Sequence, residues 1–124
     1  FPFDSKEIEK EFDKTIEIIK GIFSNNLKPT EFRRIHVFYT LFTSIYHTQF
    51  GLKNIDIESK PIDSKDYPKV RNVLERVENL FQVENVKQLN GEDVQFLTDS
   101  RRATTDTSVR IRRTKYVLNL LNSI

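Results

Sequence analysis

Apolar residues recur every three or four positions near the start of the chain, which is the spacing of one stripe along an α-helix. The pattern predicts a helix over residues 5–24, with aspartate and lysine on its other face. The predicted stripe consists of Ile8, Phe12, Ile16, Ile19 and Phe23. The next segment, Ser-Asn-Asn-Leu-Lys-Pro at residues 24–29, breaks the period and ends this helix.

A second helix is predicted between Thr30, which can cap it, and Gly51, which can end it. Glu31 then lies near the positive end of the helix. The segment is apolar over most of its circumference, so we expect it to be the central and most buried helix. Its predicted main stripe consists of Ile35, Phe38, Phe42, Ile45 and Tyr46, widened by Val37 and Leu41.

The rest of the chain alternates irregular segments with apolar periods. Residues 52–66 show no helical period and contain Pro61, which predicts a loop, and Pro68 suits the first turn of a third helix. Asn90 and Gly91 precede a short helix. The expected apolar positions are Val70, Val73, Leu74, Val77, Leu80 and Phe81 in the third helix, Val94, Phe96 and Leu97 in the short one, and Val109, Tyr116, Val117, Leu120, Leu121 and Ile124 in the last. We therefore predict an all-α, compact helical bundle of four main helices plus one short helix.

Composition supports this fold class and limits the kinds of site and the cellular location that we expect. The 124 residues are 37% hydrophobic with only 3 glycines and 4 prolines, which favours one helical domain over residues 1–124. The absence of cysteine excludes disulfides, thiolate metal sites and a cysteine nucleophile. Without a long apolar stretch or a signal peptide, we expect a cytoplasmic protein with no membrane contact. The chain has no methionine, so we expect a fragment whose partners include the remainder of its own polypeptide.

Positive charge is concentrated near the start of the last helix. Residues 101–115 contain six basic side chains and one acidic one, so this segment carries +5 while the whole chain carries +2. Hydroxyl and carboxyl side chains over residues 104–108 can cap the helix, whose first N–H groups then point outward at the positive end of its dipole. The candidate anion or nucleic-acid ligands are Arg101, Arg102, Thr104, Thr105, Ser108 and Arg112. The alternative is that this segment only caps the helix and its charges are solvated.

The arginines of the last helix differ in direction. At about 100° per residue, Arg110 and Arg113 lie on the side of Val109 and Val117, whereas Arg112 and Lys115 point away. An unpaired buried guanidinium is costly. We therefore expect Arg110 and Arg113 to pair with carboxylates of another helix or to line an anion-binding groove, with internal pairing for at least one of them.

No residue pattern indicates catalysis or a bound cofactor. His36 and His47 lie about 16 Å apart along one helix and cannot share a metal. Thr40, Thr43 and Ser44 between them form a polar stripe that we expect to be hydrated or internally hydrogen-bonded, with a polar groove or a contact to the missing polypeptide as alternatives. There is no phosphate-binding loop, metalloprotease motif or nucleophile elbow. We expect no catalytic residue, metal or cofactor in this fragment, and leave open whether the full-length chain is a nuclease or an NTPase.

The segment EDVQFLTDSRRATTDTSVRIRRTKYVLNLL resembles the C-terminal helical region of a prokaryotic family with an N-terminal ParB-like domain, found in modification-dependent restriction and other phage-defence proteins. The matching positions are Phe96, Thr105, Val109 and either Arg110 or Arg112. FYTLFTSIYHTQFGL is also similar to an upstream helix of that family. The family's Asp-Gly-x-Gln-Arg signature and His-Asn-His nuclease module are absent, so no catalytic residue is carried over. The resemblance implies a helical accessory domain that supports a nuclease or NTPase and touches DNA.

Two main hypotheses follow. In the first, this is a non-catalytic accessory domain of a DNA-directed restriction or phage-defence protein that contacts the DNA backbone through Arg101, Arg102 and Arg112, aided by residues 104–108. In the second, it is a protein-interaction or scaffold domain, which would expose an apolar patch for a partner helix. A small-ligand sensor with a pocket between helices is a third possibility.

Overall fold

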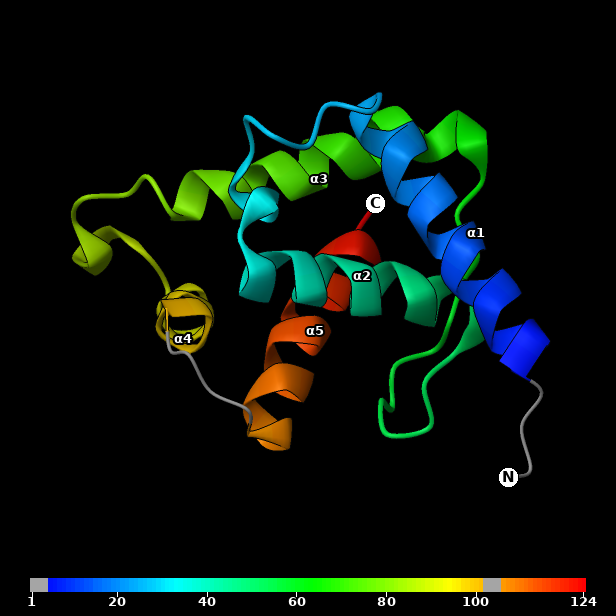
Figure 1. The fold of residues 1–124 in the computed structure, drawn as a ribbon. Coiled ribbons are helices and arrows are strands. Elements are labelled where there is room, and N and C mark those ends of the chain that lie inside the picture. Colours follow the sequence, from blue (N-terminus) through cyan, green and yellow to red (C-terminus); the bar gives the residue numbers. More distant parts are fainter. Residues whose placement is uncertain (1–4, 102–105) are drawn as a thin grey trace.

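The computed structural model describes residues 5–101 and 106–124, and every regular element in these two ranges is a helix (Figure 1). The all-α prediction is therefore confirmed. The α-helices in these ranges are α1 (Ser5–Phe23), α2 (Ile35–Phe50), α3 (Tyr67–Leu80), α4 (Gly91–Arg101) and α5 (Thr107–Leu121). Short 3-10 turns lie at η1 (Glu31–Arg33), η2 (Ser64–Asp66) and η3 (Val86–Gln88).

Helix α2 runs through the middle of the molecule and packs against α1 and α5 (Figure 1). Helix α3 packs against α1 and α5, and α4 lies beside α5. The core forms where these helices meet, around Leu41, Ile45, Leu74, Val77 and Val117, all of which are fully buried. Burying each such side chain stabilises the fold by roughly 1.5–3 kcal/mol. The same packing determines which faces of α2 and α5 remain free to contact a ligand or a partner.

Several helix ends form as the sequence predicts. Asn90 accepts a hydrogen bond from the Asp93 N–H and so caps the start of α4. Pro68 occupies the first turn of α3, where an N–H is not needed. Helix α2 ends at Gly51, whose φ of 77° suits glycine and whose N–H donates to the His47 carbonyl.

The start of α2 differs from the prediction. Thr30 caps η1 by accepting from the Phe32 N–H, and α2 begins only at Ile35 after an extended Arg34. The reason is packing, because the η1 turn carries Phe32 into the core, where its ring lies 5.5 Å from that of Phe23.

The predicted stripe of α2 is also wrong in part. Ile35 is 78% exposed, and the aromatic side chains of the stripe are only partly buried. The buried face instead combines apolar residues with small hydroxyl residues: Val37, Thr40, Leu41, Ser44, Ile45 and Thr48. The Thr40 and Ser44 hydroxyls donate to carbonyls of their own helix, which lets them be buried without losing a hydrogen bond. The expected internal bonding of the polar stripe is thus confirmed.

His47 fixes the loop that follows α2. Its ring is buried, Nε2 donates to the Ile57 carbonyl at 2.6 Å, and Nδ1 accepts from the Leu52 N–H at 2.8 Å. These bonds hold the irregular segment after Gly51 against the end of α2. The loop therefore presents a fixed wall beside α2 and α5.

Candidate functional site

The basic segment spans the end of α4 and the start of α5. Arg101 is exposed at the last position of α4, whereas Arg102, Thr104 and Thr105 lie outside the described residues. Asp106 is the N-cap of α5, and its carboxylate accepts from both the N–H of Ser108, at 2.9 Å, and the Ser108 hydroxyl, at 2.8 Å. Ser108 is exposed, but both of its donors are already used.

Arg112 does not point away from the protein as expected. Its Nε and Nη2 donate to the two oxygens of Asp99 at 2.7 and 2.6 Å, and the Asp99 side chain is fully buried. The hydrogen bonds from Arg112 hold the pKa of Asp99 below its usual value of 3.8. The side of α5 opposite its apolar stripe, which was expected to face solvent, packs beside α4 in the folded chain. Arg112 keeps half of its side chain exposed, so phosphate contact stays a prediction for it, but its guanidinium is not free.

Arg113 lies on the apolar side of α5, as predicted, and is buried. Its Nη1 donates to the backbone carbonyl of Asp99 at 2.9 Å, so its bond to α4 reaches a carbonyl and not the expected carboxylate. Its Nε is buried without a partner among the described residues. Burial lowers the pKa of the guanidinium, while the Asp99 charge opposes this effect.

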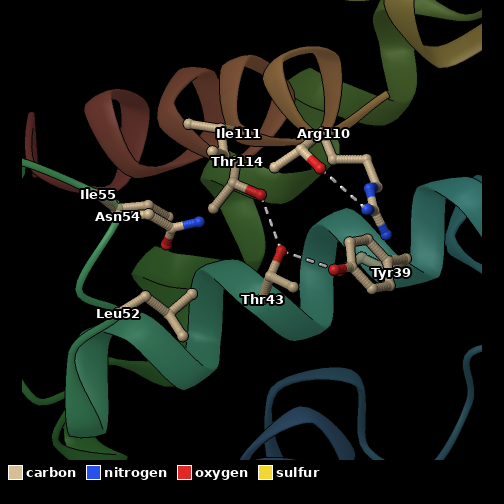
Figure 2. A pocket seen from close by; sticks show the side chains of 9 residues that line it. Tyr39, Thr43, Leu52, Asn54, Ile55, Arg110, Ile111 and Thr114 are labelled. Atoms are coloured by element: carbon tan, nitrogen blue, oxygen red, sulfur yellow. Dashed lines mark hydrogen bonds between the residues drawn. The ribbon is translucent and has the colours of Figure 1, made fainter. Parts of the chain in front are cut away.

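Arg110 follows the second expectation and lines a groove. Its guanidinium lies 5.5 Å from the centre of the Tyr39 ring, and its Nη2 donates to the Thr107 hydroxyl at 3.4 Å. Within the described part of the chain Arg110 forms no ion pair, and its Nε is buried without a hydrogen-bond partner. The groove is a pocket of about 180 Å³ between α2, α5 and the loop after α2 (Figure 2). It is lined by Tyr39, Thr43, Leu52, Asn54, Ile55, Thr107, Arg110, Ile111 and Thr114.

The charge available at the basic segment is smaller than the sequence indicates. Lys115 pairs with Asp56 at 2.9 Å, in addition to the Arg112 pair with Asp99. Sequence reasoning missed both acidic partners because nothing local marks them, and they meet α5 only after the chain folds. Arg101, Arg110 and Arg113 are the segment's described basic side chains that the structure leaves without a carboxylate partner, and of these Arg113 is buried.

A second feature is a surface that we call the aromatic face, formed by side chains of α1 and α2: Ile8, Phe12, Tyr39, Phe42, Tyr46 and Phe50. Neighbouring ring centres are 4.8 Å apart for Phe12 and Phe42, and 5.1 Å apart for Tyr46 and Phe50. Phe12 is 51% exposed and Ile8 42%, although both belong to the predicted apolar stripe of the first helix. A shallow hollow of about 310 Å³ lies over most of this face.

One polar group anchors the aromatic face. The Tyr46 hydroxyl donates to the Glu11 carboxylate, which ties α2 to α1. Burial and this carboxylate raise the pKa of Tyr46 to about 12. The phenol therefore stays neutral near pH 7, and the face has one fixed polar contact among its rings.

Neither a metal site nor a membrane-spanning helix is indicated in the ranges that the structure covers. No group of three or more histidine, aspartate or glutamate side chains there is placed to hold a metal ion. In the same ranges no helix combines the length and apolar content needed to cross a membrane. Comparison of the chain with protein families, curated proteins and solved structures finds no match in any of the three.

Proposed function

We propose that this chain is a non-catalytic helical accessory domain, arranged as a compact bundle, that docks onto another protein through its aromatic face. The supporting observation is the cluster of apolar side chains that α1 and α2 leave partly exposed side by side. Contiguous exposed apolar patches on soluble domains commonly mark interaction sites, whereas single exposed apolar residues do not. Aromatic residues are also the side chains that contribute most to binding at protein interfaces.

The partner that fits this surface is an amphipathic helix. Phe42, Tyr46 and Phe50 are four residues apart on α2, so their rings form a ridge that advances one helical turn at a time. Ridges of this spacing pack into the grooves of a second helix. Phe12 contributes from α1 and makes the surface wider than one helix face. The remainder of the polypeptide, in a protein of the ParB-like family, is the proposed source of that helix.

Site-specific photocrosslinking tests the docking role. A photoreactive phenylalanine analogue is placed at Phe12 or at Phe50, and at Ile35 as the control, because Ile35 is exposed but does not belong to the aromatic face. We expect the same crosslinked segment from both face positions and not from Ile35. A synthetic peptide of that segment should then bind wild-type protein at least about tenfold more tightly than the Phe12→Ser variant. Identical products at all three positions, or unchanged peptide affinity, would contradict the proposal.

A second candidate function is contact with nucleic-acid phosphate in a restriction or phage-defence protein, through Arg101, Arg102, Thr104, Thr105, Ser108 and Arg112. The observation that favours it is Arg101, which is exposed at the end of α4 and forms no ion pair with the described residues. Because Arg112 and Lys115 are paired internally, we expect fewer phosphate contacts than the segment's charge suggests.

A salt titration tests this second candidate. The slope of log K against log salt for duplex binding should fall by about one unit when Arg101 is replaced by glutamine, since each phosphate contact contributes about 0.9. The Lys60→Gln variant is the control, because Lys60 is exposed in the loop far along the sequence from the basic segment. Absence of binding at low salt, or an equal change in slope for both variants, would contradict this function.

A further inference from the structure

The pocket beside Arg110 has a positive charge and no acidic lining. Its lining contains one guanidinium, hydroxyl and amide side chains and apolar walls, but neither aspartate nor glutamate. Three described carboxylates near α5 are engaged by other groups, since Asp99 binds Arg112, Asp56 binds Lys115 and Asp106 accepts from Ser108 at the helix start. Arg110 also adds to the positive potential around the buried Arg113, whose pKa its charge lowers. Arg110 therefore forms no ion pair within the part of the chain described.

The hydrogen-bond donors of this pocket are not all used by the protein. Arg110 uses Nη2 for its hydrogen bond to Thr107, and its Nη1, which is not buried, forms no hydrogen bond with the described residues. The Thr107 hydroxyl accepts from Arg110, so its own hydrogen is left to donate. The Asn54 side-chain amide forms no hydrogen bond in the ranges that the structure describes, and Figure 2 shows Asn54 across the pocket from Arg110. By contrast, Thr43 and Thr114 bond to each other at 2.8 Å.

The size and position of the pocket restrict the ligand. A volume of about 180 Å³ is below the roughly 300–1,000 Å³ of sites for drug-sized molecules, so the pocket suits one small group. The pocket lies beside the first two turns of α5, and its Thr107 edge belongs to the first turn, where the helix dipole favours negative charge. Its free donors come from α5 and from the opposite loop, and therefore approach from different sides. A tetrahedral anion offers oxygens in those directions, whereas a carboxylate offers two oxygens in one plane.

We propose that this pocket binds a phosphate group, with Arg110 as the cationic ligand and Thr107 and Asn54 as hydrogen-bond donors. The phosphate belongs either to a free phosphate or small phosphate ester, or to a nucleic-acid backbone. The site does not depend on the docking role of the aromatic face, although Tyr39 borders both surfaces. The pocket uses Arg110, which faces α2, and does not include Arg112, which faces α4.

The test is a titration of the isotope-labelled protein with inorganic phosphate at constant ionic strength, followed by amide NMR shifts. We expect saturable shifts at Asn54, Thr107 and Arg110. The Arg110→Gln variant should bind phosphate at least about tenfold more weakly, the loss of a charge-assisted contact. Arg76→Gln is the matched control, because it removes the same charge from an exposed site on α3 outside the pocket, and it should leave phosphate affinity unchanged.

Two further measurements make every result informative. Asn54→Ala, in the exposed loop, should weaken phosphate binding about threefold and serves as the test if Arg110→Gln does not fold. A short DNA duplex that displaces phosphate, and loses affinity in Arg110→Gln, identifies a backbone phosphate as the ligand; a duplex that does not displace it identifies free phosphate or a small ester. Shifts that do not saturate, or equal losses in Arg76→Gln and Arg110→Gln, would overturn the site. Failure of the phosphate site would not affect the docking proposal, which is tested separately by photocrosslinking at Phe12 and Phe50.

Discussion

Replacing Asp99 by asparagine should destabilise the fold by about 3 kcal/mol at neutral pH. The Asp99 side chain is fully buried and accepts two hydrogen bonds from Arg112 and one from Gln95. Removing one partner of a fully buried ion pair costs about 3–5 kcal/mol. We take the lower end because half of the Arg112 side chain is exposed and its charge can be hydrated in the variant. The buried Arg113 also loses the favourable interaction with the Asp99 charge.

Urea unfolding followed by circular dichroism measures this loss. Asp99→Asn should lower the free energy of unfolding without a large change in the denaturant slope, because the folded core is retained. Asp13→Asn is the control, since Asp13 is exposed on α1, and it should change stability by no more than about 0.5 kcal/mol. A loss below about 1 kcal/mol for Asp99→Asn would refute the claim that this carboxylate balances the arginines of α5.

The same pair predicts a pH dependence of known sign. The hydrogen bonds from Arg112 lower the pKa of Asp99 in the folded protein below the 3.8 of an ordinary aspartate. A lowered carboxyl pKa contributes stability that is present above about pH 4 and is lost as pH falls through the folded pKa. The difference in stability between wild type and Asp99→Asn should therefore shrink below pH 4. A difference that stays constant from pH 7 to pH 2 would show that the ion pair is not its source.

Two further predictions concern α1 and α2. A Cβ at Gly21 would lie 2.5 Å from the Tyr67 ring, so Gly21→Ala should lower the free energy of unfolding by about 1 kcal/mol, even after the better helix propensity of alanine is counted. Gly91→Ala is the control, because a Cβ there meets open space, and it should not lower stability. Urea unfolding measures both, and equal effects would contradict the close contact at Gly21. Burial and Glu11 raise the pKa of Tyr46 to about 12, so its contribution to stability is present below pH 10 and lost as pH rises towards 12. Tyr46→Phe should remove that alkaline loss, and the phenol missing from its absorbance titration should be one that ionises near pH 12 in wild type. Loss of a phenol that ionises near pH 10 would contradict the raised pKa of Tyr46.

Some elements follow from local sequence alone. Val70, Val73, Leu74 and Val77 share one face of α3, and each is buried as its spacing predicts. Asn90 and Gly51 act at helix ends through their own side-chain and backbone chemistry, which needs no tertiary partner. In these cases the local preference and the packed fold agree, so periodicity and capping are sufficient.

Helix α2 shows why periodicity was not sufficient elsewhere. Hydrophobicity alone ranks Phe42 and Tyr46 above Thr40 and Ser44 as core residues, yet the structure buries the small hydroxyl residues more completely. A small side chain whose hydroxyl donates to a carbonyl one turn earlier loses no hydrogen bond on burial, and it lets α5 approach closely. The displaced aromatic rings then form the surface for which we propose a partner. The error in the predicted stripe and the candidate docking site thus have the same physical cause.

The arginines of α5 show the same dependence on neighbours. Arg110 and Arg112 are two positions apart, which turns them about 200° from each other on the helix. Arg112 meets a buried carboxylate of α4, so its charge stabilises the fold, whereas Arg110 meets the Tyr39 ring of α2, which attracts a cation but does not neutralise it. Two arginines of the same helix can therefore have different roles: one that faces a carboxylate stabilises the fold, and one that faces an aromatic ring can still bind an anion. For an anion, the consequence is that the α2 side of α5 offers an uncompensated charge, while on the α4 side it would have to compete with Asp99.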